Sequence, residues 1–138
     1  MAEELRTSAL EFIRAHRDVH LATVEGDRPH VRVMEVARTE DDFTIWFACG
    51  KSSAKVQQIG QCPNVAVSAY GDHKDLVVEG RAEVLDDQPT RREMWRDEWK
   101  TYFPGGPDDP EYCFIKVTAE AARYRDLKET GFEAVNVL

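Results

Sequence analysis

Two lysines and two serines directly follow an apolar, aromatic run at residues 43–49. The run ends at Gly50, and Lys51, Ser53 and Lys55 lie within the next five residues. A serine that caps a short helix leaves backbone N–H groups free at the first turn, and these groups together with lysine side chains attract an anion. The segment therefore predicts a cradle for a phosphate group beside an apolar strand that can seat a planar ring.

Other residues extend this predicted site. Arg32 is a cation in the middle of an apolar run, and Val33, Met34, Phe47 and Ala48 are apolar residues next to the predicted cradle. A flavin mononucleotide (FMN) has the expected shape, with a planar ring and a phosphate tail. The same lysines also fit a solvated basic helix, because lysine side chains usually face water. Spacing alone leaves both interpretations open.

Length and charge limit the classes of function. A chain of 138 residues, 42% hydrophobic and 32% charged, predicts a single domain over residues 1–138. No run is long and apolar enough to span a bilayer. The net charge of −8 argues against nucleic-acid and anionic-membrane partners, which need a positive surface. The N-terminal residues lack the basic start and apolar run of a signal peptide, so we expect a cytoplasmic protein.

The cysteines and histidines offer little chemistry. Three cysteines lie far apart, without the spacing of a zinc site or a disulfide framework. Cys49 is either an ordinary buried thiol or, beside Lys51 and a helix start, a thiol with a lowered pKa. His16 and His20 are four apart, but the helix is expected to end between them, so we expect no metal site. No residue has the setting of a dedicated catalytic acid, base or nucleophile.

Periodicity predicts a mainly β (α+β) fold. Apolar residues at helical spacing predict a first amphipathic helix over residues 3–16, and further helices are expected at 53–60 and 87–102. Strands are expected at 19–24, 30–38, 43–49, 65–70, 75–85, 112–117 and 121–126. Because most of these strands are joined by hairpins, we expect an antiparallel sheet closed into a small barrel with helices outside.

Several segments in this order resemble a known family. They are "HLATVEGDRPHVRVM", "IWFACGKSSAKVQQIGQCPNVAVSAY", "VVEGRAEVLDD" and "FPGGPDDPEYCFIKVTAEAARYRD". The chain from about residue 11 to residue 126 resembles the pyridoxamine 5'-phosphate oxidase-like FMN-binding split barrels, in particular their general stress protein branch. The resemblance implies a six-stranded antiparallel split β-barrel with flanking helices. It also implies a homodimer with FMN at the interface.

The resemblance assigns cofactor contacts to the residues already singled out. The implied contacts to the phosphate and its side of the flavin are Arg32, Lys51, Ser53 and Lys55, and the implied ring contacts are Val33, Met34, Phe47 and Ala48. Lys55 takes the position of the family's phosphate lysine. These positions agree with the electrostatic argument made from the residues alone.

Four positions depart from the family pattern. Ala48 replaces a common hydroxyl residue, Ala54 an arginine of the true oxidases, Asp75 a neutral amide near the ring, and Arg125 a frequent tryptophan. A deazaflavin or another phosphate-bearing ligand is therefore an alternative to FMN. The C-terminal arginine and histidine signature that grips a pyridoxal phosphate substrate is absent, which argues against vitamin B6 oxidation.

The expected function is that of an FMN-binding oxidoreductase that transfers electrons or hydride between a reduced donor and a small-molecule acceptor. The flavin would carry the electron chemistry, and the protein would supply position and electrostatics. The alternative is a non-catalytic flavin- or ligand-binding stress-response module with the same barrel.

Overall fold

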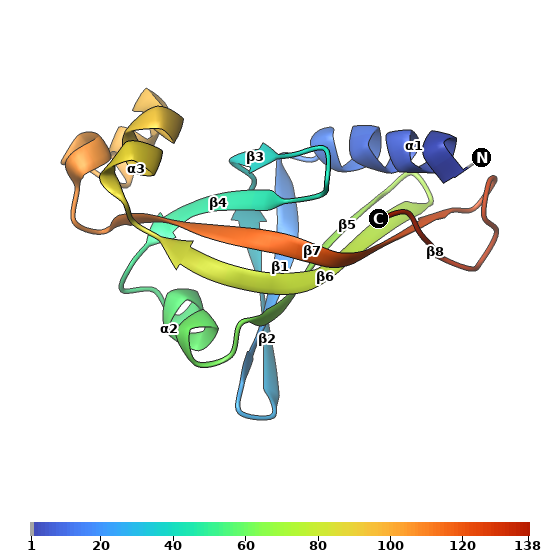
Figure 1. Ribbon diagram of the computed structural model, residues 1–138, viewed down its shortest axis with the longest axis horizontal. Helices are drawn as coiled ribbons and strands as arrows, with labels where there is room; N and C mark the ends of the chain where they lie inside the picture. The colour runs from blue at the N-terminus through green and yellow to red at the C-terminus, as the bar shows by residue number, and fades with distance from the viewer. Residues whose placement is uncertain (1) are drawn as a thin grey trace.

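A curled antiparallel sheet forms the frame of the protein (Figure 1). The computed structural model describes residues 2–138. The strands are β1 (Asp18–Glu25), β2 (Arg28–Glu35), β3 (Arg38–Thr39), β4 (Ile45–Gly50), β5 (Asn64–Gly71), β6 (Lys74–Leu85), β7 (Tyr112–Asp126) and β8 (Val135–Asn136). The helices are α1 (Ala2–Arg14), α2 (Ala54–Gln61), α3 (Gln88–Met94) and two short 3-10 helices, η1 (Asp97–Thr101) and η2 (Gly106–Asp108).

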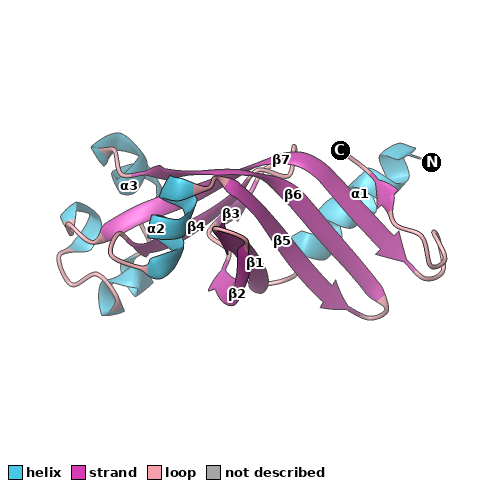
Figure 2. Cartoon of the chain, turned by 90° about the horizontal axis from the view of Figure 1, so that it is seen from below, coloured by secondary structure: helices cyan, strands magenta, loops and turns pink. Residues whose placement is uncertain are grey.

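The strand order confirms the predicted split barrel. The ladder follows the path β2-β1-β5-β6-β7-β4-β3, with β8 added beside β7. Each of these strand pairings is antiparallel. Six strands are long, and β3 and β8 have two residues each, so the expected six strands gain two short additions. Figure 2 shows α2 and α3 near one end of the sheet and α1 at the other.

Two tight hairpins account for much of the pairing. Gly26 has a φ of +62° in the two-residue turn between β1 and β2, a conformation that glycine adopts without steric cost. Asp72 and His73 both have positive φ in the turn between β5 and β6. The predicted antiparallel pairing of both hairpins is confirmed.

Three predicted elements differ from the structure. The strand expected over 30–38 ends at Glu35, and Arg38 and Thr39 form the separate strand β3. Residues 112–126 form one strand, β7, where two were expected, and its register against β6 shifts between Glu79 and Gly80. This bulge accommodates residues 118–120, which lie between the two expected strands, so β7 continues through them. The helix expected over 87–102 ends at Met94, because Trp95 has an extended ψ of 140°, and the chain resumes as η1.

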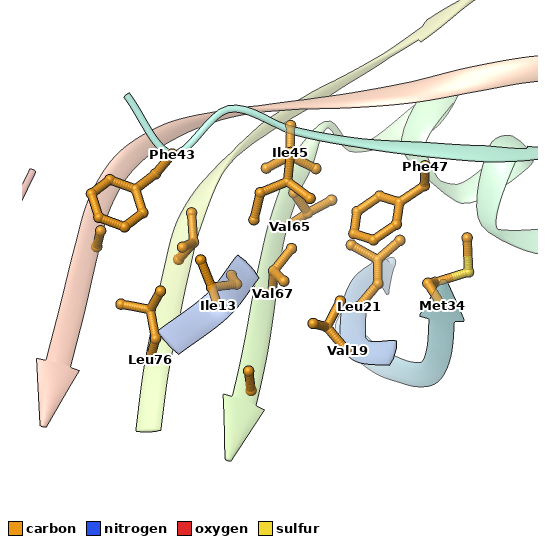
Figure 3. Close-up of a cluster of buried hydrophobic side chains, with 14 of the residues drawn as sticks. Ile13, Val19, Leu21, Met34, Phe43, Ile45, Phe47, Val65, Val67 and Leu76 are labelled. Atoms are coloured by element: carbon orange, nitrogen blue, oxygen red, sulfur yellow. The ribbon is translucent and has the colours of Figure 1, made fainter. Parts of the chain in front are cut away.

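The main core lies between the sheet and α1. Helix α1 buries Ala9, Leu10 and Ile13, and its acidic first turn and basic last turn complement the helix dipole. Leu21 and Phe47 are fully buried, and Figure 3 shows both in the same group of apolar side chains as Ile13. None of the helices within residues 2–138 has both the length and the apolar composition that crossing a bilayer requires.

A second cluster of buried side chains lies at the end of the sheet that carries α3. This aromatic cluster consists of Trp46, Trp99, Phe103, Tyr112 and Phe114, with Trp95 packed against it. The rings meet edge to face or tilted, with centroids 5.2–6.0 Å apart. The cluster fixes η1 against the start of β7 and so positions the residues that follow η1.

Candidate functional site

A cavity of about 420 Å³ opens where β2, β4, α2 and η1 approach one another. Apolar residues of β2 and β4 form one wall. Aromatic residues of η1 and of the two positions after it form a second, aromatic wall, and charged side chains lie among them. The lining residues are Val33, Met34, Glu35, Val36, Ala48, Cys49, Gly50, Lys55, Trp99, Tyr102, Phe103 and Glu111.

Four of the eight predicted site residues line this cavity. Val33 and Met34 come from β2, Ala48 from β4 and Lys55 from the first turn of α2. Since β2 and β4 are far apart in the strand order, the curl of the sheet is what brings these residues together. Val33 is 61% exposed, so its side chain is available for contact. Their part in binding stays a prediction.

The side chain of Phe47 points away from this cavity. It is fully buried in the main core (Figure 3). Successive residues of a strand face opposite sides, and Ala48 lines the cavity. At this position only the backbone is available to a ring in the cavity.

Arg32 lies beneath α2 and does not line the cavity. Its guanidinium donates to the carbonyl oxygen of Leu21 and to Oε1 of Gln58, both at 3.0 Å. Gln58 Oε1 also accepts from the hydroxyl of the buried Thr23 at 2.5 Å. Burial lowers the pKa of the guanidinium, which still carries its charge at neutral pH. Arg32 thus joins β2 to α2 and leaves a positive charge beneath the helix.

The loop between β4 and α2 differs in detail from the predicted cradle. Ser53 is the N-cap residue of α2, but its hydroxyl donates to the carbonyl oxygen of Gly50 at 2.7 Å and caps no N–H group of the helix. The N–H groups of the first turn therefore have no side-chain cap. Lys51 Nζ lies 2.8 Å from Asp86, and this contact holds the pKa of Asp86 below its ordinary value. Of Lys51 and Lys55, Lys55 is the one that lines the cavity.

Sequence reasoning missed two acidic residues that line the cavity. Glu35 pairs with Arg17, with Nε and Oε1 3.4 Å apart. Glu111 accepts a hydrogen bond from the hydroxyl of Ser52 at 2.7 Å. The pairing of β7 with β4 places Tyr112 opposite Gly50 and thus Glu111 beside the loop. No local sequence signal reveals that pairing, since 62 positions separate these two facing residues.

Cys49 borders the cavity, but its thiol is buried in the main core, on the side of β4 that Phe47 occupies. Its Sγ lies 3.7 Å from Sγ of Cys113, the residue directly opposite on β7. The hydrogen bond between the two thiols and burial raise the pKa of Cys49 above its ordinary value. The hypothesis of a lowered pKa beside Lys51 is therefore wrong, because these two effects outweigh the nearby positive charge.

The aromatic wall of the cavity consists of Trp99 in η1 and of Tyr102 and Phe103, which follow it. Trp99 and Phe103 are buried in the aromatic cluster, whereas Tyr102 is 69% exposed at the rim of the cavity. The guanidinium of Arg96 lies 5.2 Å from the ring centroid of Trp99 and adds a cation–π contact to the packing of η1. The wall is therefore rigid beneath an accessible tyrosine ring.

Two of the departures from the family pattern contact each other. Arg125 Nε donates to Asp75 at 2.9 Å, and the two residues face each other on β7 and β6. They line a second cavity of about 180 Å³ together with Tyr70 and Phe132. Asp75 is the second residue of the twelve-residue β6, whose other end lies near the first cavity, so about 30 Å of strand separates them. Within one chain this ion pair lies outside the first cavity.

Comparisons with known proteins identify relatives along nearly the whole chain. The family model described as "Pyridoxamine 5'-phosphate oxidase like" matches residues 5–136. General stress protein 26 of Bacillus subtilis (strain 168) is 25% identical over 133 residues, which cover 92% of each chain.

Solved structures share the fold. The general stress protein 26 of Bacillus anthracis str. Sterne superimposes with a TM-score of 0.77 at 29% identity, covering 88% of this chain and 93% of that one. A related protein of Clostridium acetobutylicum gives a TM-score of 0.83 at 21% identity, covering 97% and 94%. A pyridoxamine 5'-phosphate oxidase-related, FMN binding protein of Nostoc punctiforme PCC 73102 gives 0.75 at 24% identity, covering 94% and 85%.

Proposed function

Because the chain belongs to the pyridoxamine 5'-phosphate oxidase-like family, we propose that it is a cytoplasmic flavoprotein that binds FMN in the cavity between β2, β4, α2 and η1. It would act as an oxidoreductase that passes electrons or hydride from a reduced donor to a small-molecule acceptor. One observation carries the proposal: Val33, Met34, Ala48 and Lys55, chosen from the sequence for a flavin, come from three separate elements and line one cavity.

The cavity suits the two parts of the cofactor. Val33 and Ala48 offer an apolar wall for a planar ring, Met34 lies behind this wall in the main core, and Lys55 supplies a cation for a phosphate. The N–H groups of the first turn of α2 lack a side-chain cap, so they are free to donate to an anion. The positive charge of Arg32 beneath α2 adds attraction at longer range.

The part of the chain in the chemistry is binding and orientation. FMN, when bound, accepts and releases electrons one or two at a time. Cys49 is the cysteine that borders the cavity, but its thiol is buried in the main core and its raised pKa keeps it protonated and a poor nucleophile. The aromatic wall and the backbone of β2 and β4 would hold the ring and exclude water from one face of it.

Replacing Lys55 tests the proposal. We expect Lys55→Ala to weaken FMN binding about 10- to 100-fold, because a charge-assisted contact to the phosphate contributes about 1.5–3 kcal/mol. Lys51→Ala is the matched control: it removes the same charge four residues earlier in the chain, but Lys51 is paired with Asp86. Isothermal titration calorimetry with FMN measures both. Equal affinity in wild type and Lys55→Ala would contradict the proposed phosphate site.

We also propose a homodimer with the cofactor at its interface. Strand β2 is an edge of the sheet, and it exposes Val31 and Val33 by 64% and 61%. Exposed apolar side chains on an edge strand are characteristic of a surface that another chain covers. A second chain is also the means by which the Asp75–Arg125 pair can approach the first cavity.

The dimer predicts a clear result for one substitution. Val31→Asp places a charge on the exposed face of β2 and should shift the protein from a dimer to the 15.8 kDa monomer in sedimentation equilibrium. Val135→Asp, at an exposed position of β8, is the control and should leave the mass unchanged. A wild-type chain that sediments as a monomer at micromolar concentration would refute the dimer.

A non-catalytic flavin- or ligand-binding module is the second candidate. The methyl group of Ala48 on the cavity wall favours it, because no hydroxyl is available there to hydrogen-bond the ring. Anaerobic mixing of the FMN-loaded protein with NADH and NADPH separates the two. Bleaching of the flavin absorbance, followed by recovery when an acceptor is added, supports the oxidoreductase, and a bound flavin that neither donor reduces supports the module. The same assay, run on protein loaded with a deazaflavin in place of FMN, tests that alternative cofactor.

A further inference from the structure

The carboxylate of Glu111 binds the loop that leads into α2 and the proposed phosphate site. Its Oε2 accepts from the hydroxyl of Ser52 at 2.7 Å and from the backbone N–H of Ser52 at 3.3 Å. The backbone of Glu111 also binds the loop, because its carbonyl oxygen accepts from the N–H of Lys51 at 2.8 Å. Glu111 thus reaches the loop both through its backbone and through its charged group.

Gly50 leaves the space that this carboxylate fills. A Cβ atom at Gly50 would lie 3.2 Å from Oε2 of Glu111, which is tighter than ordinary contact. Glu111 lines the same cavity as Lys55. A negative group therefore already uses the hydroxyl and N–H donors of Ser52, next to the lysine that we assign to the phosphate.

The charges near the loop do not cancel this negative group. Lys51 is paired with Asp86 and Glu35 with Arg17, so both of these pairs are neutral. Among the described residues that line the cavity, Lys55 and Glu111 are the charged residues that form no ion pair. A phosphate that approaches Lys55 meets the charge of Glu111 and finds the Ser52 donors taken.

We propose that Glu111 is a built-in competitor of the phosphate group: it holds the Ser52 donors in the free protein and lowers the affinity for phosphate-bearing ligands. This proposal rests on the proposed FMN site. The consequence is selective, because the carboxylate opposes the charge of the phosphate and leaves the binding of the ring unaffected. The protein would hold FMN less tightly than its cavity permits and would exchange it more readily.

Two flavins and one substitution test the proposal. Riboflavin has the ring of FMN but lacks the phosphate, so comparing the two isolates the phosphate end. Glu111→Gln keeps the size of the side chain and an acceptor for Ser52 while removing the charge. At low salt we expect Glu111→Gln to bind FMN about three- to tenfold more tightly, the effect of removing one like charge at an exposed site, and to bind riboflavin as wild type does.

Glu35→Gln is the matched comparison. It removes the same charge from the same cavity but does not touch the Ser52 loop, so its gain in FMN affinity should be smaller than that of Glu111→Gln. Raising the salt concentration from about 0.05 to about 0.5 M should shrink the Glu111→Gln gain, because exposed charges are screened. Calorimetric titrations of wild type and both variants, each checked by a thermal melt, provide these values.

The outcomes separate this proposal from the one on which it rests. Wild type that binds FMN while Glu111→Gln binds it equally or more weakly overturns the role of Glu111 and leaves the FMN site intact. An equal gain for riboflavin also overturns it, because the effect would then not concern the phosphate. If neither flavin binds to wild type or to Glu111→Gln, the FMN site fails and the role of Glu111 fails with it.

Discussion

Gly80→Ala is expected to destabilise the protein by about 4 kcal/mol or more, which places it among the most damaging single substitutions. A Cβ atom at Gly80 would lie 2.0 Å from the carbonyl oxygen of Thr118 and 2.9 Å from its carbonyl carbon. Both are backbone atoms of the neighbouring strand, so no side-chain rotation relieves the clash. The β6–β7 ladder would have to open at the bulge that lies beside Gly80.

Gly60→Ala is the control for this prediction. Gly60 lies in α2, and a Cβ atom at this position would have no neighbouring atom within 4 Å, so alanine fits and improves helix propensity. Here we expect a gain of about 0.5–1 kcal/mol. Urea unfolding followed by circular dichroism measures both variants. A Gly80→Ala protein as stable as wild type would show that the close approach of β6 and β7 is not rigid.

Phe47→Ala should cost about 3–5 kcal/mol of stability, because the ring is fully buried in the main core and its removal leaves a cavity. For a chain of this length the melting temperature should fall by about 10–17 °C. The milder Phe47→Leu variant should keep its affinity for FMN within about twofold when measured well below its melting temperature, since the side chain faces away from the cavity.

Val33→Ala should behave in the opposite way. Val33 lines the cavity and is largely exposed, so truncation should change stability by less than about 1 kcal/mol and weaken FMN binding. Calorimetry of flavin binding and thermal melts of the two variants give the four values. A large loss of FMN affinity in folded Phe47→Leu would mean that its side chain, and not only its backbone, contacts the ring.

Local signals predicted the parts of the fold that depend on neighbours in sequence. The turn at Gly26 and the turn after Gly71 were recognisable because both lie between alternating strands, and each joins a tight hairpin. The break after Met94 was not visible, because Trp95 and Trp99 have helical spacing in the sequence. In the structure the two rings pack edge to face with centroids 6.0 Å apart, although Trp95 and Arg96 are extended and separate α3 from η1. Tertiary packing overrides the local preference there.

The site shows the same division. Val33, Met34, Ala48 and Lys55 follow from the strand pattern and the position of the helix start, and they line one cavity, whereas the side chain of Phe47 is buried in the core. The partners of the other cations come from distant parts of the chain: Asp86 for Lys51 and Gln58 for Arg32. The spacing of residues 51–55 carries no information about such partners, because they depend on which strands become neighbours.

The aromatic cluster concentrates every tryptophan of the chain at one end of the molecule. Trp46 and Trp99 are buried in it, and Trp95 packs against it. Tryptophan emission, excited selectively over tyrosine, therefore reports on the cavity end alone, while the region around α1 is silent. Since Trp99 lines the cavity itself, a bound isoalloxazine ring would lie within energy-transfer range of all three indoles. A flavin bound in the proposed site would thus be reported by the protein's own tryptophans, and no label would be needed to follow binding in real time.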